Sequence, residues 1–332
     1  MRQSRRGKPV VQNRNGPMGS ASVPELIGLP VRSLGFLIRI SAAVSWLVAA
    51  PGILPAAPVV PWQAGDRFFV AESIVQDMQL RELRDDAAND PQIDERRLAR
   101  TTWTEYRVLA AEESGAVRIA ATILSIRDAN DQPLPLSSRL NKVRLEFRID
   151  RDRRISEITG YEEFIQQIAS GNRYHARLLK SICSQQALRQ SFSLFFQNWP
   201  PADDETKDWR SEAVIPAGPL GTFTINWQYQ FESDADDAGI RRFRGRGTAR
   251  YETSTSNPSD QPVKVNSGRL QLDNLVATGQ MDSRTGRLRE LKTELTASGR
   301  LTLRVGRQNT TVEVTQKQST QIRVLDKMPA LP

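Results

Sequence analysis

Alternation of apolar and polar residues dominates the sequence from residue 62 onward. The clearest case is Lys142–Ile149, where apolar and charged side chains take strictly alternate positions. The segments Phe223–Phe231 and Val117–Ile123 repeat the pattern with apolar residues at every second position. Strands with one apolar and one polar face are typical of antiparallel sheets that keep one face in water. The pattern therefore predicts an antiparallel sheet built from many short strands.

Turn-forming residues separate these predicted strands at the distances expected of hairpins. The predicted turns are Glu113–Gly115, Asp150–Arg153, Glu232–Gly239 and Gly306–Asn309. Two longer polar stretches, Arg84–Arg97 and residues 253–267, carry Asn, Asp, Ser and Pro and are predicted to be loops. The spacing predicts about ten strands in all.

One block, from Tyr161 to Trp199, departs from the strand pattern. Its apolar residues recur at the three- and four-residue spacing of amphipathic helices. The three stripes are Phe164, Ile165 and Ile168; Leu178, Leu179 and Ile182; and Leu188, Phe192, Phe195 and Trp199. Two consecutive prolines, Pro200 and Pro201, end the block. We therefore predict an α+β fold, mainly antiparallel β, with a large curved sheet or half-barrel and an inserted helical segment at residues 161–199.

The N-terminal 61 residues differ from the rest in charge and composition. Residues 1–40 hold seven basic residues and one acidic residue, an apolar segment follows at Ile40–Ala50, and small residues and prolines run to Pro61. This order is typical of an export signal, and an uncleaved N-terminal anchor is the alternative. We expect residues 62–332 to form a single β-rich domain that is periplasmic or extracellular, with membrane contact only through the N-terminal segment.

The scarcity of reactive side chains limits the chemistry open to this chain. His175 is the sole histidine and Cys183 the sole cysteine, which excludes a multi-histidine zinc site, a cysteine cluster and an internal disulfide. The sequence contains no nucleophile elbow, phosphate loop or dinucleotide fingerprint. We therefore predict no catalytic residues, no metal site, no cofactor and no enzymatic activity. A hydrolase using two facing carboxylates is a lesser alternative.

Net charge alone suggests a nucleic-acid partner, because it is +8 over the chain. Seven of the basic residues lie in the leader, whereas residues 41–332 hold 39 basic and 37 acidic residues. The folded part is therefore nearly neutral, and no nucleic-acid partner is expected. On a strand, Arg242, Arg244 and Arg246 share one face, opposite a face of small and aromatic residues. We interpret this face as solvated and as a candidate interaction surface.

Several short motifs together resemble an uncharacterised family of secreted bacterial β-rich proteins, a domain of unknown function. They begin at Gly65-Asp66-Arg67-Phe68 and include the pattern apolar-Asp-turn-apolar-x-Glu-apolar at residues 149–158. They continue with Pro216-Ala217-Gly218-Pro219, Trp227-x-Tyr229-x-Phe231 and a last hairpin with Asp282 and Gly286-Arg287-Leu288. The layout is also similar to the LolA-like lipoprotein-carrier half-barrels. That resemblance implies a curved antiparallel sheet whose concave face, covered by helices, holds a lipid chain.

Two functions are consistent with these observations. The first is a non-enzymatic exported envelope protein that binds a hydrophobic ligand or lipid between sheet and helices. Its candidate ligand-binding residues are the helical Phe164, Ile168, Leu178, Ile182, Phe192 and Phe195. The second is a structural or protein-interaction module of the envelope, with Arg242, Arg244 and Arg246 on its contact surface and an envelope protein as partner.

Overall fold

The computed structural model describes most of the chain beyond residue 61. The described residues are 62–83, 93–134, 137–141, 143–151, 153–197, 207–216, 221–232, 235–236, 238–253, 263–305 and 308–328. All of them belong to one compact unit, Arg39–Pro332. The predicted export segment, residues 1–61, lies outside the described residues.

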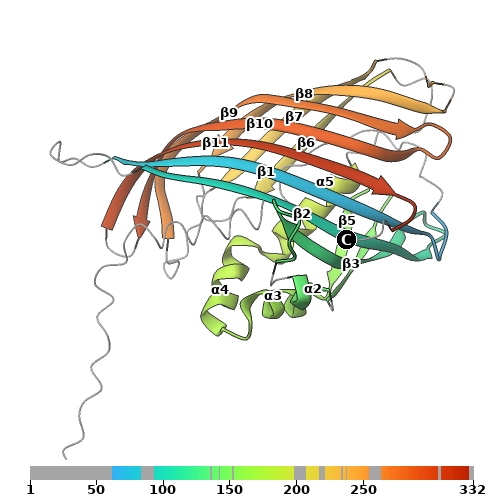
Figure 1. Ribbon diagram of the computed structural model, residues 1–332, viewed down its shortest axis with the longest axis horizontal. Coiled ribbons are helices and arrows are strands. Elements are labelled where there is room, and N and C mark those ends of the chain that lie inside the picture. The colour runs from blue at the N-terminus through green and yellow to red at the C-terminus, as the bar shows by residue number, and fades with distance from the viewer. Residues whose placement is uncertain are drawn as a thin grey trace, which may run out of the picture. The chain divides into compact units, whose positions relative to one another are not determined.

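A single antiparallel sheet of eleven strands makes up most of the described chain (Figure 1). The strands are β1 Arg67–Leu83, β2 Ile93–Ala111, β3 Val117–Asp128, β4 Arg144–Ile149, β5 Ile155–Thr159, β6 Asp208–Pro216, β7 Thr222–Phe231, β8 Ile240–Glu252, β9 Val263–Asp282, β10 Arg287–Val305 and β11 Gln308–Leu325. Their order is β5-β4-β3-β2-β1-β11-β10-β9-β8-β7-β6. Strands adjacent in sequence pair with each other, except that β5 and β6 form the two edges, and β11 returns to pair with β1. The predicted antiparallel fold is confirmed.

The strands are much longer than the alternation predicts. β9 contains 20 residues and β2 and β10 contain 19 each, so the prediction of short strands is wrong. The predicted loops are also too long, because Ile93–Arg97 belongs to β2 and residues 263–267 belong to β9. Pairing of β1 with β2 continues to the partners Arg81 and Ile93. The backbones of these segments still pair with the neighbouring strand although their side chains are polar. A pattern of hydrophobic residues cannot predict pairing of this kind.

The predicted helical insert is confirmed and resolves into three helices. They are α3 Tyr161–Ala169, α4 Arg173–Ile182 and α5 Gln185–Gln197. The short helix α2, Ser137–Leu140, was not predicted. α3 begins after Gly160, whose φ of 82° is a left-handed conformation that glycine adopts without strain. A β-carbon at Gly160 would lie 2.3 Å from the carbonyl oxygen of Arg144, so this close approach also requires glycine.

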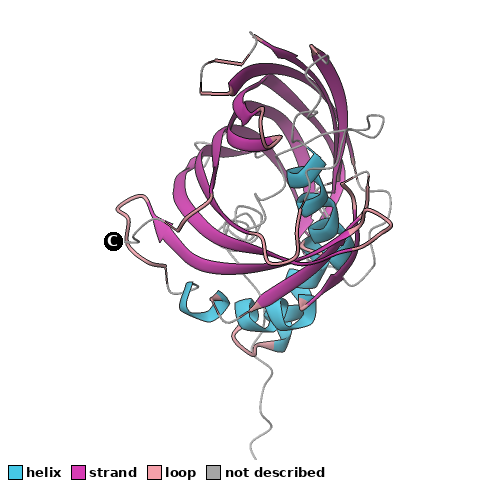
Figure 2. Ribbon diagram, turned by 90° about the vertical axis from the view of Figure 1, so that its right-hand side faces the viewer, coloured by secondary structure: helices cyan, strands magenta, loops and turns pink. Residues whose placement is uncertain are grey.

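Helix α5 contacts both edge strands of the curved sheet, β5 and β6 (Figure 2). Its side chains hydrogen-bond to backbone groups of the edge strand β5. The amide of Ile155 donates to Ser193 Oγ at 2.8 Å, and Gln185 Nε2 and Arg189 Nη1 donate to the carbonyls of Ile158 and Ser156, each at 3.0 Å. Unpaired edge groups invite pairing with other chains. α5 therefore protects one edge of the sheet and lies where the two edges approach each other.

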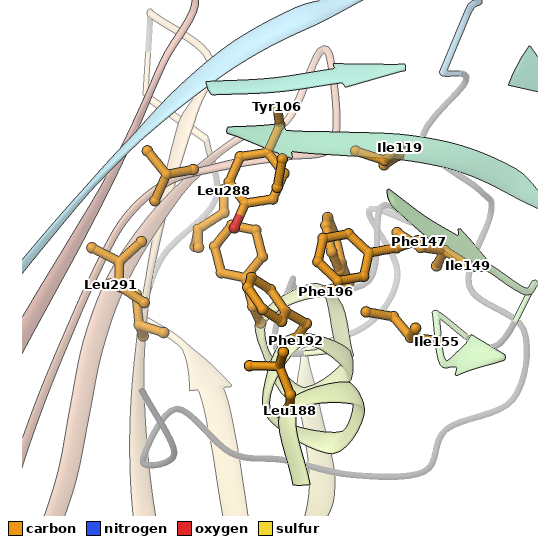
Figure 3. Close-up of a cluster of buried hydrophobic side chains, with 14 of the residues drawn as sticks. Tyr106, Ile119, Phe147, Ile149, Ile155, Leu188, Phe192, Phe196, Leu288 and Leu291 are labelled. Carbon is orange, nitrogen blue, oxygen red and sulfur yellow. The ribbon is translucent and has the colours of Figure 1, made fainter. Parts of the chain in front are cut away.

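The aromatic side chains of α5 pack directly on the concave face of the sheet, here called the inner face. The ring of Phe192 lies 4.5 Å from that of Phe147 on β4. Phe195 stacks on Tyr106 of β2 with ring centres 5.6 Å apart, and Phe196 meets the same ring edge-on at 5.9 Å. Figure 3 shows this cluster, with leucines of β10 approaching from the other side. The hydrophobic core therefore lies between α5 and the inner face.

Glycines make room for large aromatic rings on the inner face of β7, β8 and β9. Three rings each lie opposite a glycine of the neighbouring strand: Trp227 opposite Gly247, Tyr229 opposite Gly245, and Phe243 opposite Gly279. A β-carbon at Gly279 would lie 2.2 Å from Cζ of Phe243, and one at Gly245 would lie 2.4 Å from Cε1 of Tyr229. Rings that lie across a glycine cover its backbone and stabilise the strand pair. The predicted inner face of small and aromatic residues is confirmed.

Ion pairs join the beginning and the end of the sheet. Arg287, at the start of β10, binds Asp66 just before β1, with Nη2 to Oδ2 at 3.0 Å. Arg289 binds the buried Asp282 at 2.7 Å and Asp326 at 2.8 Å. The Arg289 guanidinium and two backbone amides lower the pKa of Asp282, although its burial opposes this effect. Asp66 from the first motif and Asp282 and Arg287 from the last hairpin motif thus serve one structural role.

Candidate functional site

Polar residues interrupt the apolar inner face midway along β1. Even-numbered residues of β1 point inward, and Glu72 and Gln76 take positions in a row otherwise filled by residues such as Phe68 and Ile74. On the flanking strands, Thr102 lies opposite Glu72, and Arg100 and Thr320 lie opposite Ile74. We call this set the polar belt. Its members are Glu72, Gln76, Arg100, Thr102, Thr293, Gln318 and Thr320.

Glu72 and Arg100 form the charged centre of the polar belt. They sit on adjacent strands in diagonal positions and attract each other electrostatically. Burial raises the pKa of Glu72 to about 7, against the opposing effect of Arg100, and burial lowers the pKa of Arg100. Glu72 Oε2, Arg100 Nε and Nη2, and Thr102 Oγ1 are shut off from solvent without a hydrogen-bond partner among the described residues. Leaving such groups unsatisfied is costly in free energy.

A second group of unsatisfied polar atoms lies on the inner face of β6 and β7. Ser211 Oγ, Trp227 Nε1 and Tyr229 Oη are buried and have no hydrogen-bond partner in the part of the chain that the structure describes. Tyr229 stacks between Trp209 and Trp227, at ring distances of 4.9 and 5.6 Å, and its burial raises the pKa of its hydroxyl. Because the sheet curls, both groups face the same concave interior (Figure 2). The interior thus offers aromatic surfaces together with unpaired donors and acceptors.

The raised pKa of Glu72 predicts a pH-dependent cost to stability. Glu72 ionises in the unfolded chain near pH 4.5 but in the folded protein only near pH 7. Stability should therefore fall as the pH rises from about 4.5 to about 7, by up to about 3 kcal/mol, and the loss should persist above pH 7. Glu72→Gln should remove this loss, so the variant should exceed wild type in stability at pH 8 and match it near pH 4.

Urea unfolding at pH 4, 6 and 8 measures this difference. Glu294→Gln is the matched control, because Glu294 is exposed on the same sheet and pairs with Lys292. It should leave the pH dependence of wild type unchanged. A Glu72→Gln variant whose advantage grew toward low pH would contradict the assignment.

The helical residues predicted to bind a ligand lie in two different environments. Phe192 and Phe195 are buried in ring contact with the sheet, whereas Phe164 and Ile168 of α3 are partly buried against the core. Leu178 and Ile182 lie in α4, and their side chains are outside the described part. Phe192 and Phe195 thus help to fill the space under α5. That these six residues also line a ligand space stays a prediction.

The sequence contains a signal for the polar belt that its motifs do not reveal. Glu72 lies between Val70 and Ile74, which both point into the core, so it is a charge on the apolar face of a strand. Charged residues at such positions are rarely buried unless they are paired or functional. The signal is weak in β2, where Arg96 and Thr102 share the face with Arg100 and only Leu98 is apolar nearby.

The predicted arginine surface lies on the outer face of the sheet. Arg242, Arg244 and Arg246 are all exposed on β8, and Arg242 approaches Asp236 at 4.0 Å. Arg244 and Arg246 border a groove of about 440 Å³ over β6–β8, which Arg210 also lines. The register places Arg210, Gln228 and Arg246 in one row across three strands. This groove can contact an anionic group, and its role as an interaction surface stays a prediction.

The acidic residues of two predicted turns have structural roles. Asp150 and Asp236 accept hydrogen bonds from backbone amides of their own turns, at 2.8 to 3.1 Å. Cys183 is buried, which raises its pKa to about 11, and His175 lies in α4. Within the described ranges, no three side chains of the types that bind metals come together. None of the described helices has both the length and the apolar composition needed to cross a membrane.

Comparison with known proteins gives only distant similarities. No protein-family model matches the sequence, and no curated protein matches it. Among solved structures, DynF from the dynemicin biosynthesis pathway of Micromonospora chersina is 8% identical, with 85% of this chain and 92% of that chain covered and a TM-score of 0.18. The outer membrane protein OprG from Pseudomonas aeruginosa is 8% identical, with 80% and 99% covered and a TM-score of 0.19. At these values the similarity establishes neither a shared fold nor a shared function.

Proposed function

We propose that this protein is a non-enzymatic, exported binding protein that holds an amphipathic small molecule on the inner face of its curled sheet. The observation that carries the proposal is the set of buried polar atoms without partners on β1, β2, β6 and β7 among the described residues. Nearly all buried polar groups in folded proteins are hydrogen-bonded to protein, water or ligand. Several unsatisfied groups that face one interior therefore indicate a place for a bound molecule.

The composition of the inner face indicates an amphipathic ligand. On one side of the polar belt lies the aromatic core under α5, which includes Phe68 and Tyr106. On the other side, further along the sheet, β1, β10 and β11 again place buried apolar residues on the inner face, next to the paired Asp94 and Arg96 of β2. These apolar residues are Met78, Leu80, Leu301, Leu303 and Val312. A ligand with an apolar chain and one polar group matches a polar belt bordered by apolar surface.

The arrangement of α5 supports the same proposal. The helix contacts both edges of the sheet, so it separates the inner face from solvent along the side where the strands do not pair. Electrostatic and hydrogen-bonding groups act more strongly in an interior that excludes water. The basic leader followed by an apolar segment supports export, which would place the protein in the cell envelope.

Native mass spectrometry of the full chain purified from its own cell tests the proposal. We expect an added mass of a few hundred daltons that solvent extraction removes and that returns when the extract is added back. Thr293→Phe places a bulky ring on the inner face within the polar belt and should reduce the added mass. Thr296→Phe points to the outer face of the same strand and is the matched control.

Circular dichroism should show the same sheet content in both variants. A wild-type protein that carries no added mass and takes up none from the extract would contradict the proposed function. Equal loss of the added mass in the two variants would mean that the ligand does not lie on the inner face.

A further inference from the structure

Arg100 lies on the inner face of β2, and one edge of its guanidinium has no hydrogen-bond partner in the described part of the chain. The two nitrogens without a partner among the described residues, Nε and Nη2, form the side of a guanidinium that receives a carboxylate through two parallel hydrogen bonds. Arg148 uses the same edge elsewhere in the molecule, with Nε and Nη2 donating to the two oxygens of Glu112 at 3.0 and 2.7 Å. Arg100 differs because it sits on the inner face and this edge has no hydrogen-bond partner among the described residues.

The neighbours of Arg100 limit the charge that the site can accept. The raised pKa of Glu72 keeps this carboxyl partly protonated near neutral pH, and an anion beside it would favour the protonated form further. Arg96, the next arginine along the inner face of β2, already binds Asp94 through Nε at 3.0 Å. Arg100 is therefore the cation on the inner face of β2 that remains to bind a ligand. A single positive charge matches a ligand with one negative charge better than a dianion.

Thr102 supplies a further group for the same ligand. It lies directly opposite Glu72, is 1% exposed, and its Oγ1 has no hydrogen-bond partner within the described residues. A protonated Glu72 and the Thr102 hydroxyl can each donate to an anion held by Arg100. From this point, the buried apolar residues Met78 and Leu80 continue the inner face along β1.

We infer that the ligand is a fatty-acid-like molecule whose single carboxylate binds Arg100, with Glu72 and Thr102 as additional donors. This inference rests on the proposed function and names the ligand class of the same site. The carboxylate accepts both hydrogen bonds of this guanidinium edge, and the hydrocarbon chain of the ligand lies on the apolar residues of the inner face. Binding at this site would satisfy Arg100 Nε and Nη2 and Thr102 Oγ1 together.

Competitive fluorescence binding with the solvent-extracted full chain tests the ligand class. The probes are oleate, its uncharged glycerol ester monoolein, and oleoyl lysophosphatidylglycerol, whose single charge is a phosphodiester. Wild type should bind oleate at least roughly 10-fold more tightly than either of the other two. Arg100→Gln should weaken oleate binding by roughly 30-fold or more, because it removes one partner of a buried charge pair, and should leave monoolein binding unchanged.

Two variants control for folding and for surface charge. Glu72→Gln/Arg100→Gln removes both charges of the pair, so it leaves no lone buried carboxylate and should show the same loss of oleate affinity. Arg97→Gln removes an exposed arginine from the outer face of the same strand and should bind oleate as wild type does.

The possible outcomes separate this inference from the proposed function. Equal binding of oleate and monoolein, unaffected by Arg100→Gln, would overturn the carboxylate assignment and leave a binding protein for neutral lipids. Tighter binding of the lysophospholipid than of oleate would indicate that the charged group of the ligand is a phosphodiester. This result would also overturn the carboxylate assignment. Failure of wild type to bind any of the three, with no added mass in native mass spectrometry, would overturn the proposed function itself.

Discussion

Phe192→Ala is expected to lower the free energy of unfolding by about 4 kcal/mol, the loss typical of a buried phenylalanine truncated to alanine. Phe192 is 5% exposed, and its ring contacts that of Phe147 at the centre of the interface between α5 and the sheet. Truncation would remove buried apolar area and leave a cavity where α5 approaches the edge strand β5. Urea unfolding followed by tryptophan fluorescence measures the change.

The control for Phe192→Ala is Gln186→Ala, an exposed position of the same helix. Alanine favours helix at least as well as glutamine, so this variant should keep wild-type stability within about 0.5 kcal/mol. A Phe192→Ala variant as stable as the control would mean that α5 is not held on the sheet by this contact. The role of α5 in separating the inner face from solvent would then lose its basis.

Gly279→Val should lower the free energy of unfolding by about 3 kcal/mol, the upper part of the range for overpacking a core. The new β-carbon would fall 2.2 Å from Cζ of Phe243, a ring that is 1% exposed and packs against Trp209 and Tyr229. Phe231 also packs against this ring, with ring centres 6.2 Å apart, so movement of the ring would disturb its neighbours. Valine otherwise favours strands over glycine, so a loss of stability would come from the collision.

Thr278→Val is the control for Gly279→Val, because Thr278 is the preceding residue and is exposed on the outer face. It should change stability by less than about 0.5 kcal/mol. Thermal unfolding of both variants by circular dichroism measures the difference. A stabilised Gly279→Val protein would show that the Phe243 ring does not need the glycine.

Period-two alternation predicted the strands well where one face is apolar throughout. Val143–Ile149 and Phe223–Phe231 fall largely in β4 and β7 because every second position there holds a large apolar side chain. The same signal failed at Ile93–Arg97, where Asp94 and Arg96 point inward and bind each other. The hydrophobic pattern shows which side chains of a strand are buried, whereas the length of the strand depends on backbone pairing with the neighbouring strand.

The candidate site was harder to predict than the fold because it depends on strand order. Glu72 and Arg100 lie on different strands and meet only through the register of β1 and β2. Ser211 and Tyr229 face the same interior only because β11 returns to β1 and the sheet curls. The helical aromatics were visible from their spacing, but spacing does not distinguish residues that fill a core from residues that line a site.

A crystal structure of the protein purified from its own cell without solvent extraction tests the interior binding site most directly. Continuous electron density for a chain should lie along the inner face beside β1 and end within hydrogen-bonding distance of Arg100 Nε and Nη2. An inner face that held only isolated water molecules, bound to Glu72, Arg100 and Thr102, would contradict the assignment of a binding site there.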